Sequence, residues 1–116
     1  MHGVPKNLDL TFLHDSELIQ ICLGLYQVDF SFHPGGTLSV EGEWELFASD
    51  ATEIDRSSEP PRLRAFELHR LLGQRVVGSV IAPPHWIALR FEKGELLRVY
   101  DSSETYESFS IAGFYI

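Results

Sequence analysis

The sequence predicts an α+β fold that is mainly antiparallel β, with roughly six strands and one or two short helices. Two stretches alternate apolar and polar residues on either side of a glycine-containing turn, which is typical of β-hairpins. The chain has 116 residues, 44% of them hydrophobic, a size that suits one domain around one small core. We therefore expect residues 1–116 to form a single domain, with one hairpin in residues 10–47 and the other in residues 63–116.

The N-terminal segment is predicted to contain a loose arm and a short helix. Residues 1–9 are expected to be the arm, because a proline and an asparagine interrupt any regular element. Asp15 or Ser16 would cap a helix that runs through Cys22, and Gly24 would end it. The apolar neighbours of Cys22 predict a buried and inert thiol.

The first hairpin is predicted from strict alternation. One strand is expected over residues 28–32, and a nine-residue strand over 38–46 follows a glycine-containing turn. The second strand would carry Glu41, Glu43 and Glu45 as a row on one face.

The middle of the chain links the two hairpins. Residues 48–62 are polar and contain paired prolines, so they are expected to form an exposed connection. Helix-forming residues favour a short helix over 63–72. The β-branched run 76–82 is predicted to be a strand that leads into the second hairpin.

The second hairpin, within Trp86 to Ile111, has the clearest pattern. A three-residue loop that ends at a left-handed Gly94 places Leu89 opposite Leu97. The apolar residues of both strands then share one buried face, which fixes the register.

The two hairpins also resemble each other. Residues 28–40 match residues 87–99 at a constant offset, and an aromatic-x-aliphatic step follows each block, at Trp44 and at Phe109. A diverged internal repeat accounts for this match, and so does chance similarity between two amphipathic hairpins.

Residues 66–111, which include the phrase Tyr106-Glu107-Ser108-Phe109, resemble a group of small bacterial proteins of unknown function. Some members of that group are classed with immunity-like proteins, and residues 18–46 resemble it more weakly. Since the group has no established active site, the resemblance assigns no catalytic residue.

Charge and composition exclude several functions. The formal net charge of −8 and only nine Lys and Arg residues argue against binding nucleic acid, whose phosphates are held by basic side chains. No apolar run approaches the roughly 20 residues that span a bilayer, and no signal peptide is evident. The single cysteine fits a reducing compartment, so we expect a cytoplasmic protein without membrane attachment.

An acidic stretch gives the leading functional hypothesis. Residues 41–59 hold a dense set of carboxylates that could bind a basic protein partner. A solvated strand face accounts for the same residues. The hypothesis is a non-catalytic protein-interaction module that uses Glu41, Glu43, Glu45, Asp50, Glu53 and Asp55.

The alternative hypothesis is a cleft between the two halves that binds or hydrolyses a small ligand. Its candidate residues are His85, Trp86, Tyr106 and Glu107, although core packing accounts for the tryptophan and local backbone hydrogen bonding for the polar phrase. The five scattered histidines lack any metal-binding spacing, so neither a metal ion nor a cofactor is expected. A homodimer that pairs sheet edges or aromatic residues is a third hypothesis.

Overall fold

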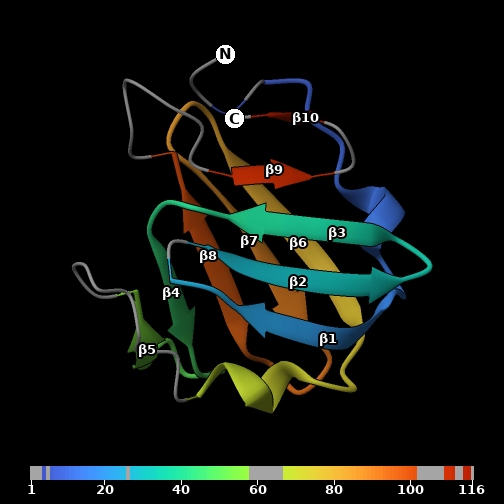
Figure 1. Ribbon diagram of the computed structural model, residues 1–116, viewed down its shortest axis with the longest axis vertical. Coiled ribbons are helices and arrows are strands. Elements are labelled where there is room, and N and C mark those ends of the chain that lie inside the picture. Colours follow the sequence, from blue (N-terminus) through green and yellow to red (C-terminus); the bar gives the residue numbers. More distant parts are fainter. Residues whose placement is uncertain are drawn as a thin grey trace.

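Two five-stranded antiparallel sheets pack face to face, and the strands of one cross those of the other (Figure 1). The computed structural model describes residues 4, 6–25, 27–57, 67–101, 109–111 and 114–115, with side chains as far as residue 101. No helix in these ranges is long and apolar enough to cross a lipid bilayer.

Ten strands and two short 3-10 helices make up the described fold. The first sheet has the order β1 (Glu17–Leu23), β2 (Val28–His33), β3 (Gly36–Val40), β9 (Phe109–Ile111) and β10 (Phe114–Tyr115). The second has the order β5 (Glu53–Arg56), β4 (Trp44–Phe47), β8 (Leu96–Tyr100), β7 (Trp86–Phe91) and β6 (Val76–Ala82). The 3-10 helix η1 (Thr11–Leu13) precedes β1, and η2 (Leu68–Leu71) precedes β6.

Strand pairing has the same form in both sheets. Each sheet begins with a three-stranded meander, β1-β2-β3 or β6-β7-β8, and the next strand of the chain crosses to the other sheet. Thus β4 pairs with β8, where Trp44 lies opposite Val99. Correspondingly, β9 pairs with β3, where Phe109 lies opposite Val40.

The core lies between the sheets and takes side chains from both. Phe32 of β2 stacks on Phe91 of β7, with ring centroids 6.4 Å apart. Burying each such side chain stabilises the fold by about 1.5–3 kcal/mol. Trp44 belongs to this core at 3% exposure.

The mainly antiparallel β fold is confirmed, and so is the register of the second hairpin. Leu89 lies opposite Leu97. Gly94 has a φ of 102°, which a left-handed position in the loop requires. The strands predicted over 28–32 and 76–82 are present as β2 and β6.

The predicted helix after Asp15 and Ser16 is wrong, because that stretch is the strand β1. Local capping signals favoured a helix, but β1 instead pairs along its length with β2. The β-branched residues Ile19 and Ile21 suit a strand, and long-range pairing overrides the local signal. Cys22 is exposed on this edge strand, so its predicted burial is also wrong.

The predicted helix over 63–72 is reduced to one 3-10 turn, η2, in the part that the structure describes. After it, Leu72 is already extended, with φ −61° and ψ 132°. Residues 63–66 lie outside the described ranges. No α-helix occurs among the described residues, so the α+β class is corrected to mainly β.

The nine-residue strand predicted over 38–46 is interrupted at residues 41–43, where the chain passes from the first sheet to the second. Gly42 is buried at this corner, and the alternation of buried and exposed residues continues through it. The alternating sequence pattern therefore could not reveal that the strand is interrupted at residues 41–43.

Two further predictions need correction. Val4 and Leu8 are 3% and 8% exposed, so the described part of the 1–9 arm packs against the core. The Val4 N–H donates to the Pro84 carbonyl at 3.0 Å. The predicted connection 48–62 contains β5, and its residues 58–62 lie outside the described ranges.

Candidate functional site

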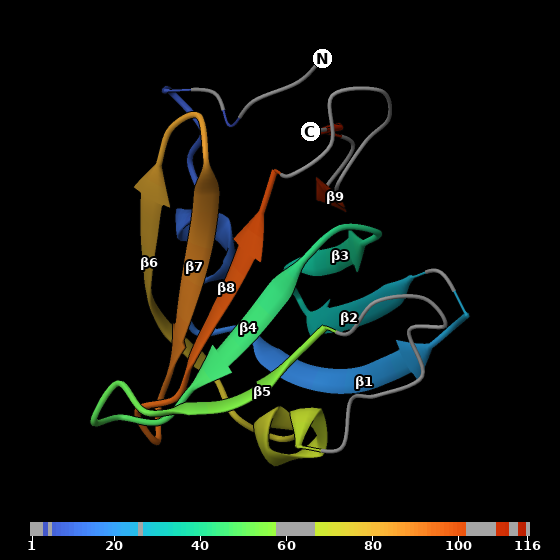
Figure 2. The same ribbon diagram turned by 90° about the vertical axis from the view of Figure 1, so that its left-hand side faces the viewer.

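The outer face of the second sheet, which points away from the first sheet, carries predicted acidic residues along its β4–β5 edge and two arginines on β7 and β8. Glu45, Phe47, Arg98 and Leu96 occupy outward positions on β4 and β8, since their neighbours in sequence point into the core. Figure 2 shows the β3–β4 connection at one end of β4 and the β4–β5 turn at the other.

The predicted row of three glutamates is not one flat strand face. Glu41 and Glu43 are exposed in the corner between β3 and β4, whereas Glu45 is half-buried on β4 itself. The corner separates the first two carboxylates from the third. The structure therefore assigns Glu45 a different environment from its two neighbours.

Glu45 belongs to a polar network on the outer face. It pairs with Arg56 of β5, where Nη2 lies 3.2 Å from Oε2, and it accepts a short hydrogen bond from the Tyr100 hydroxyl. Burial acts to raise the pKa of Glu45, but the interactions with Tyr100, Glu53 and Arg56 outweigh it and hold this pKa below its usual value. The carboxylate is thus held ionised by internal partners.

Glu53 shares the same arginine. Its Oε1 lies 3.2 Å from Nε of Arg56, and its hydrogen bond with Glu45 raises the pKa of the Glu53 carboxyl. Two carboxylates around one guanidinium leave this corner of the sheet with surplus negative charge. Glu53 is the more accessible of the two carboxylates, with 39% of its side chain exposed against 18% for Glu45.

Asp55 has a structural role. It is 9% exposed, and its two carboxylate oxygens accept hydrogen bonds from the backbone N–H of Arg56 at 2.9 Å and of Glu67 at 3.0 Å. These bonds tie β5 to the approach to η2. A partner in solution would find this carboxylate already occupied.

Asp50 is exposed in the β4–β5 turn, where it accepts a hydrogen bond from the Thr52 N–H at 3.0 Å. That hydrogen bond lowers the pKa of Asp50. Together with the corner glutamates and Glu53, it forms a set of exposed carboxylates along β4 and β5. We call this set the acidic edge, and its members are Glu41, Glu43, Asp50 and Glu53.

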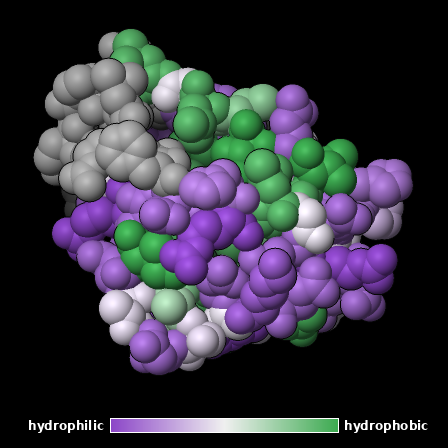
Figure 3. Space-filling model, turned by 90° about the horizontal axis from the view of Figure 1, so that it is seen from below, coloured by the Kyte–Doolittle hydropathy of each residue, from purple (hydrophilic) through white to green (hydrophobic). Residues whose placement is uncertain are grey.

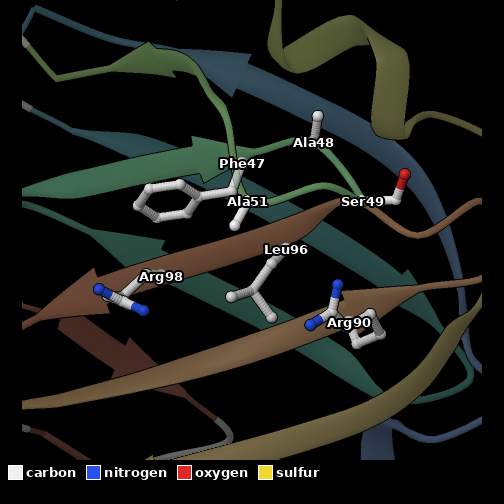
Figure 4. A pocket seen from close by; sticks show the side chains of 7 residues that line it. All are labelled: Phe47, Ala48, Ser49, Ala51, Arg90, Leu96 and Arg98. Atoms are coloured by element: carbon white, nitrogen blue, oxygen red, sulfur yellow. The ribbon is translucent and has the colours of Figure 1, made fainter.

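A hollow of about 250 Å³ opens on the same outer face (Figure 4). It lies where the β4–β5 turn meets the end of β7 and the first half of β8. In Figure 4, the side chains of Arg98 and Arg90 stand on either side of Leu96. We call it the arginine hollow, and it is lined by Phe47, Ala48, Ser49, Ala51, Arg90, Leu96 and Arg98.

Aromatic rings hold Arg98 in place. The centre of its guanidinium lies 4.4 Å from the ring centroid of Trp86 and 5.0 Å from that of Phe47, and its Nη1 donates to the Tyr100 hydroxyl at 3.3 Å. Nε of Arg98 is buried and has no hydrogen-bond acceptor. Trp86 is thus half-buried under an arginine on the outer face, which corrects its predicted place in the core.

Of the four residues predicted for a ligand cleft, the structure describes His85 and Trp86. His85 is exposed and follows β6, and its carbonyl accepts a hydrogen bond from the Asp101 N–H at 2.8 Å. Trp86 contacts Arg98, as above. Tyr106 and Glu107 lie outside the described residues. Within the described ranges, no three His, Cys, Asp or Glu side chains gather as a metal site would require.

The edge of the first sheet is a separate surface. Ile19 and Leu23 of the edge strand β1 are 56% and 61% exposed, and Leu72, which follows η2, is 45% exposed. Figure 3 views the molecule from this side and shows hydrophobic side chains interrupted by hydrophilic ones. A homodimer that uses a sheet edge stays a prediction.

Sequence reasoning missed Arg90 and Arg98. The predicted register already placed both on the outer face, because each alternates with a core residue of the hairpin. The sequence could not show that Phe47 and Ala51 line the same hollow, since their position depends on the pairing of β4 with β8.

Comparison of the chain with models of protein families, with curated proteins and with solved structures gave no match.

Proposed function

We propose that the protein is a non-catalytic, cytoplasmic interaction module, immunity-like in role, whose acidic edge binds a basic protein partner. The observation that carries this proposal is the local charge. Residues 41–57 contain six carboxylates and one basic residue, Arg56, and four of the six are exposed. Such a surface attracts cationic partners and speeds their association at low salt.

The internal hydrogen bonds divide the predicted carboxylates into two groups. Glu45 and Asp55 are held by groups of the protein itself, so they support β4 and β5. The acidic edge lies around this rigid support. A partner with Lys or Arg residues spaced along β4 would therefore meet carboxylates at both ends of the strand.

We further infer that the two halves descend from one duplicated unit. Each sheet has a bulge at the same point of its first strand, at Ile19 in β1 and at Val77 in β6. Glu17, the first residue of β1, also pairs with Arg75, which immediately precedes β6, as expected for equivalent residues beside a two-fold axis. The resemblance to immunity-like proteins and this repeat together support a small binding scaffold.

The test is an affinity capture with the purified protein from cells of its source, at low and high salt, followed by calorimetry with each captured protein. One variant neutralises three exposed carboxylates, with Glu43→Gln, Asp50→Asn and Glu53→Gln. We expect a basic partner whose affinity for this variant falls on the order of tenfold, with a weaker salt dependence.

A matched control makes the same charge change elsewhere, at exposed positions around η1 and the start of β1, with Asp9→Asn, Asp15→Asn and Glu17→Gln. It should bind within about twofold of the unmodified protein, because these residues lie away from the acidic edge. If both triple variants capture the same proteins with equal affinity, the acidic edge is not the binding surface.

A second candidate function is the binding of a small ligand. The observation that favours it is the arginine hollow next to Trp86. A site between the two halves is not favoured, because the described core side chains of the two sheets fill the space between the sheets.

A further inference from the structure

The arginine hollow has a charge opposite to that of the protein around it. The chain carries 17 Asp and Glu residues against nine Lys and Arg, yet two of its arginines line one hollow of the outer face. Within the described ranges, the ion pairs of arginine involve Arg56 and Arg70, and neither Arg90 nor Arg98 lies within 4.0 Å of a carboxylate. Among the residues that the structure describes, two guanidinium groups of this acidic protein thus have no acidic partner.

Arg98 has unused capacity to donate hydrogen bonds. A guanidinium carries five N–H donors, and this one makes a single hydrogen bond, to Tyr100, in the described structure. Glu45 lies opposite Arg98 in register but pairs with Arg56 instead. Because stacking on Phe47 and Trp86 fixes the plane of the guanidinium, a ligand would meet a pre-organised donor.

Arg90 stands at the other side of Leu96. Its Nη1 donates to the Gly94 carbonyl at 2.7 Å, which anchors the side chain to the β7–β8 loop. Gly94 in turn lies against Ser49, since a Cβ atom at Gly94 would come within 2.6 Å of the Ser49 Cβ. The loop, the β4–β5 turn and both arginines therefore form one supported rim.

The floor between the arginines is apolar. Leu96 is its centre, with Phe47 and Ala51 beside it. On the same face Ala88, opposite Arg98 in register, is fully buried, so this face of the sheet carries a packed layer of its own. A hollow of about 250 Å³ is smaller than the usual site of a drug-sized molecule and suits a group of side-chain size.

The fold does not require these residues. The hairpin β2–β3 has the same register as β7–β8, and its outward positions hold small or polar residues in place of the arginines and the leucine. Ser31 matches Arg90, and Ser39 matches Arg98. A sheet of this geometry is thus stable without a guanidinium at either position.

We propose that the arginine hollow is a binding site for the carboxylate group of a ligand with a short apolar body, held by Arg98 and Arg90 over the floor of Phe47, Ala51 and Leu96. Arginine forks match the geometry of a carboxylate, and the apolar floor accommodates an aliphatic or aromatic group. A monoanion is favoured over a phosphate dianion because the surrounding protein is strongly negative. The carboxylate could come from a small acid or from the C-terminal residue of a peptide.

The test compares acid and amide pairs by calorimetry and by tryptophan fluorescence, to which Trp86 beside the hollow and the buried Trp44 both contribute. The small pair is 3-phenylpropionate and 3-phenylpropionamide, and the peptide pair is a hexapeptide ending in Phe with a free or an amidated C-terminus. We expect the acids to bind and to change the fluorescence, and the amides to bind at least about tenfold more weakly. Tighter binding of the free peptide identifies a chain end as the source, and tighter binding of the small acid identifies a metabolite.

Variants then assign the contacts. Arg98→Lys keeps the charge but loses the planar fork, so we expect on the order of tenfold weaker binding of the acid, and a smaller loss for Arg90→Gln. Arg75→Gln, an exposed arginine outside the hollow, is the control and should bind as the unmodified protein does. Unfolding curves identify variants that remain folded.

Three results would overturn the proposal. The first is equal binding of acid and amide, because the hollow would then not recognise charge. The second is unmodified affinity in folded Arg90→Gln and Arg98→Lys variants. The third is no binding of either acid up to its solubility limit. Each of these results is independent of the acidic edge, whose residues remain unchanged in these variants.

Discussion

The outer faces of the two sheets differ, although the hairpins that form them have the same register. On β2 and β3 the outward positions hold Asp29, Ser31, Thr37 and Ser39, which are exposed or half-buried. The equivalent positions on β7 and β8 hold Ala88, Arg90, Leu96 and Arg98. The first set is what a solvated sheet needs, whereas the second builds a hollow with fixed charges. The difference is the basis for proposing a ligand site on the second face.

The inner faces, in contrast, both carry buried apolar residues at equivalent positions. Substitutions at these positions are expected to have the largest effects on stability. Phe30 of β2 and Leu89 of β7 hold equivalent positions and are 0% and 1% exposed. We expect Phe30→Ala and Leu89→Ala each to lower the free energy of unfolding by about 2–5 kcal/mol, because each leaves a cavity. Urea denaturation measures both. A loss below about 1 kcal/mol in one of them would show that the two inner faces are unequal.

The next effect concerns the rim of the hollow. Gly94→Ala should lower the free energy of unfolding by about 1–3 kcal/mol, because φ is +102° and the new methyl group would collide with Ser49. Thermal unfolding of Gly94→Ala beside that of Gly73→Ala checks this. Gly73 also has a positive φ, +82°, but open space around it, so its loss should be the smaller one. Equal losses of stability in the two variants would show that the contact with Ser49 does not add to the cost of Gly94→Ala.

A smaller effect is expected from exchanging the outer faces. Arg98→Ser gives the second sheet the residue of the first and removes the stacking on Phe47 and Trp86, which costs about 1 kcal/mol of stability. Ser39→Arg makes the reverse change and should alter stability by no more than about 0.5 kcal/mol. Urea denaturation measures both variants. If the two changes have equal cost, Arg98 is no better placed than an arginine on the first sheet.

The smallest effect depends on pH. Glu45→Gln should lower stability at pH 7 by about 0.5–1 kcal/mol, reduced by the partial exposure of the pair. Since the folded protein holds the pKa of Glu45 below its ordinary value of 4.5, this stability is present above that value and is lost as the pH falls through the folded pKa. Urea denaturation across that range should show the difference between protein and variant disappearing. A constant difference would mean that charge is not involved.

Much of the second hairpin could be predicted because its signals are local. Alternation, together with a glycine at the end of a three-residue loop, determined that Leu89 faces Leu97. The stretch that forms β1 carried helix-capping signals, and only its pairing with β2 makes it a strand. The corner at Gly42 was hidden because alternation continues through it.

The candidate sites show the same division. The sequence could not show which carboxylates are exposed. Asp55, for example, is buried and accepts a hydrogen bond from the backbone N–H of Glu67, 12 residues away. That Arg90 and Arg98 share a face follows from the register. That they border a hollow depends on the β4–β5 turn, which reaches them through the pairing of two distant strands.

The most direct test of the difference between the two outer faces is an amide and side-chain NMR titration of the whole chain with 3-phenylpropionate. We predict shifts concentrated at Trp86, Arg90, Leu96 and Arg98, with the equivalent positions Asp29, Ser31, Thr37 and Ser39 unmoved. Shifts spread equally over both sheets, or concentrated on the first sheet, would contradict the account.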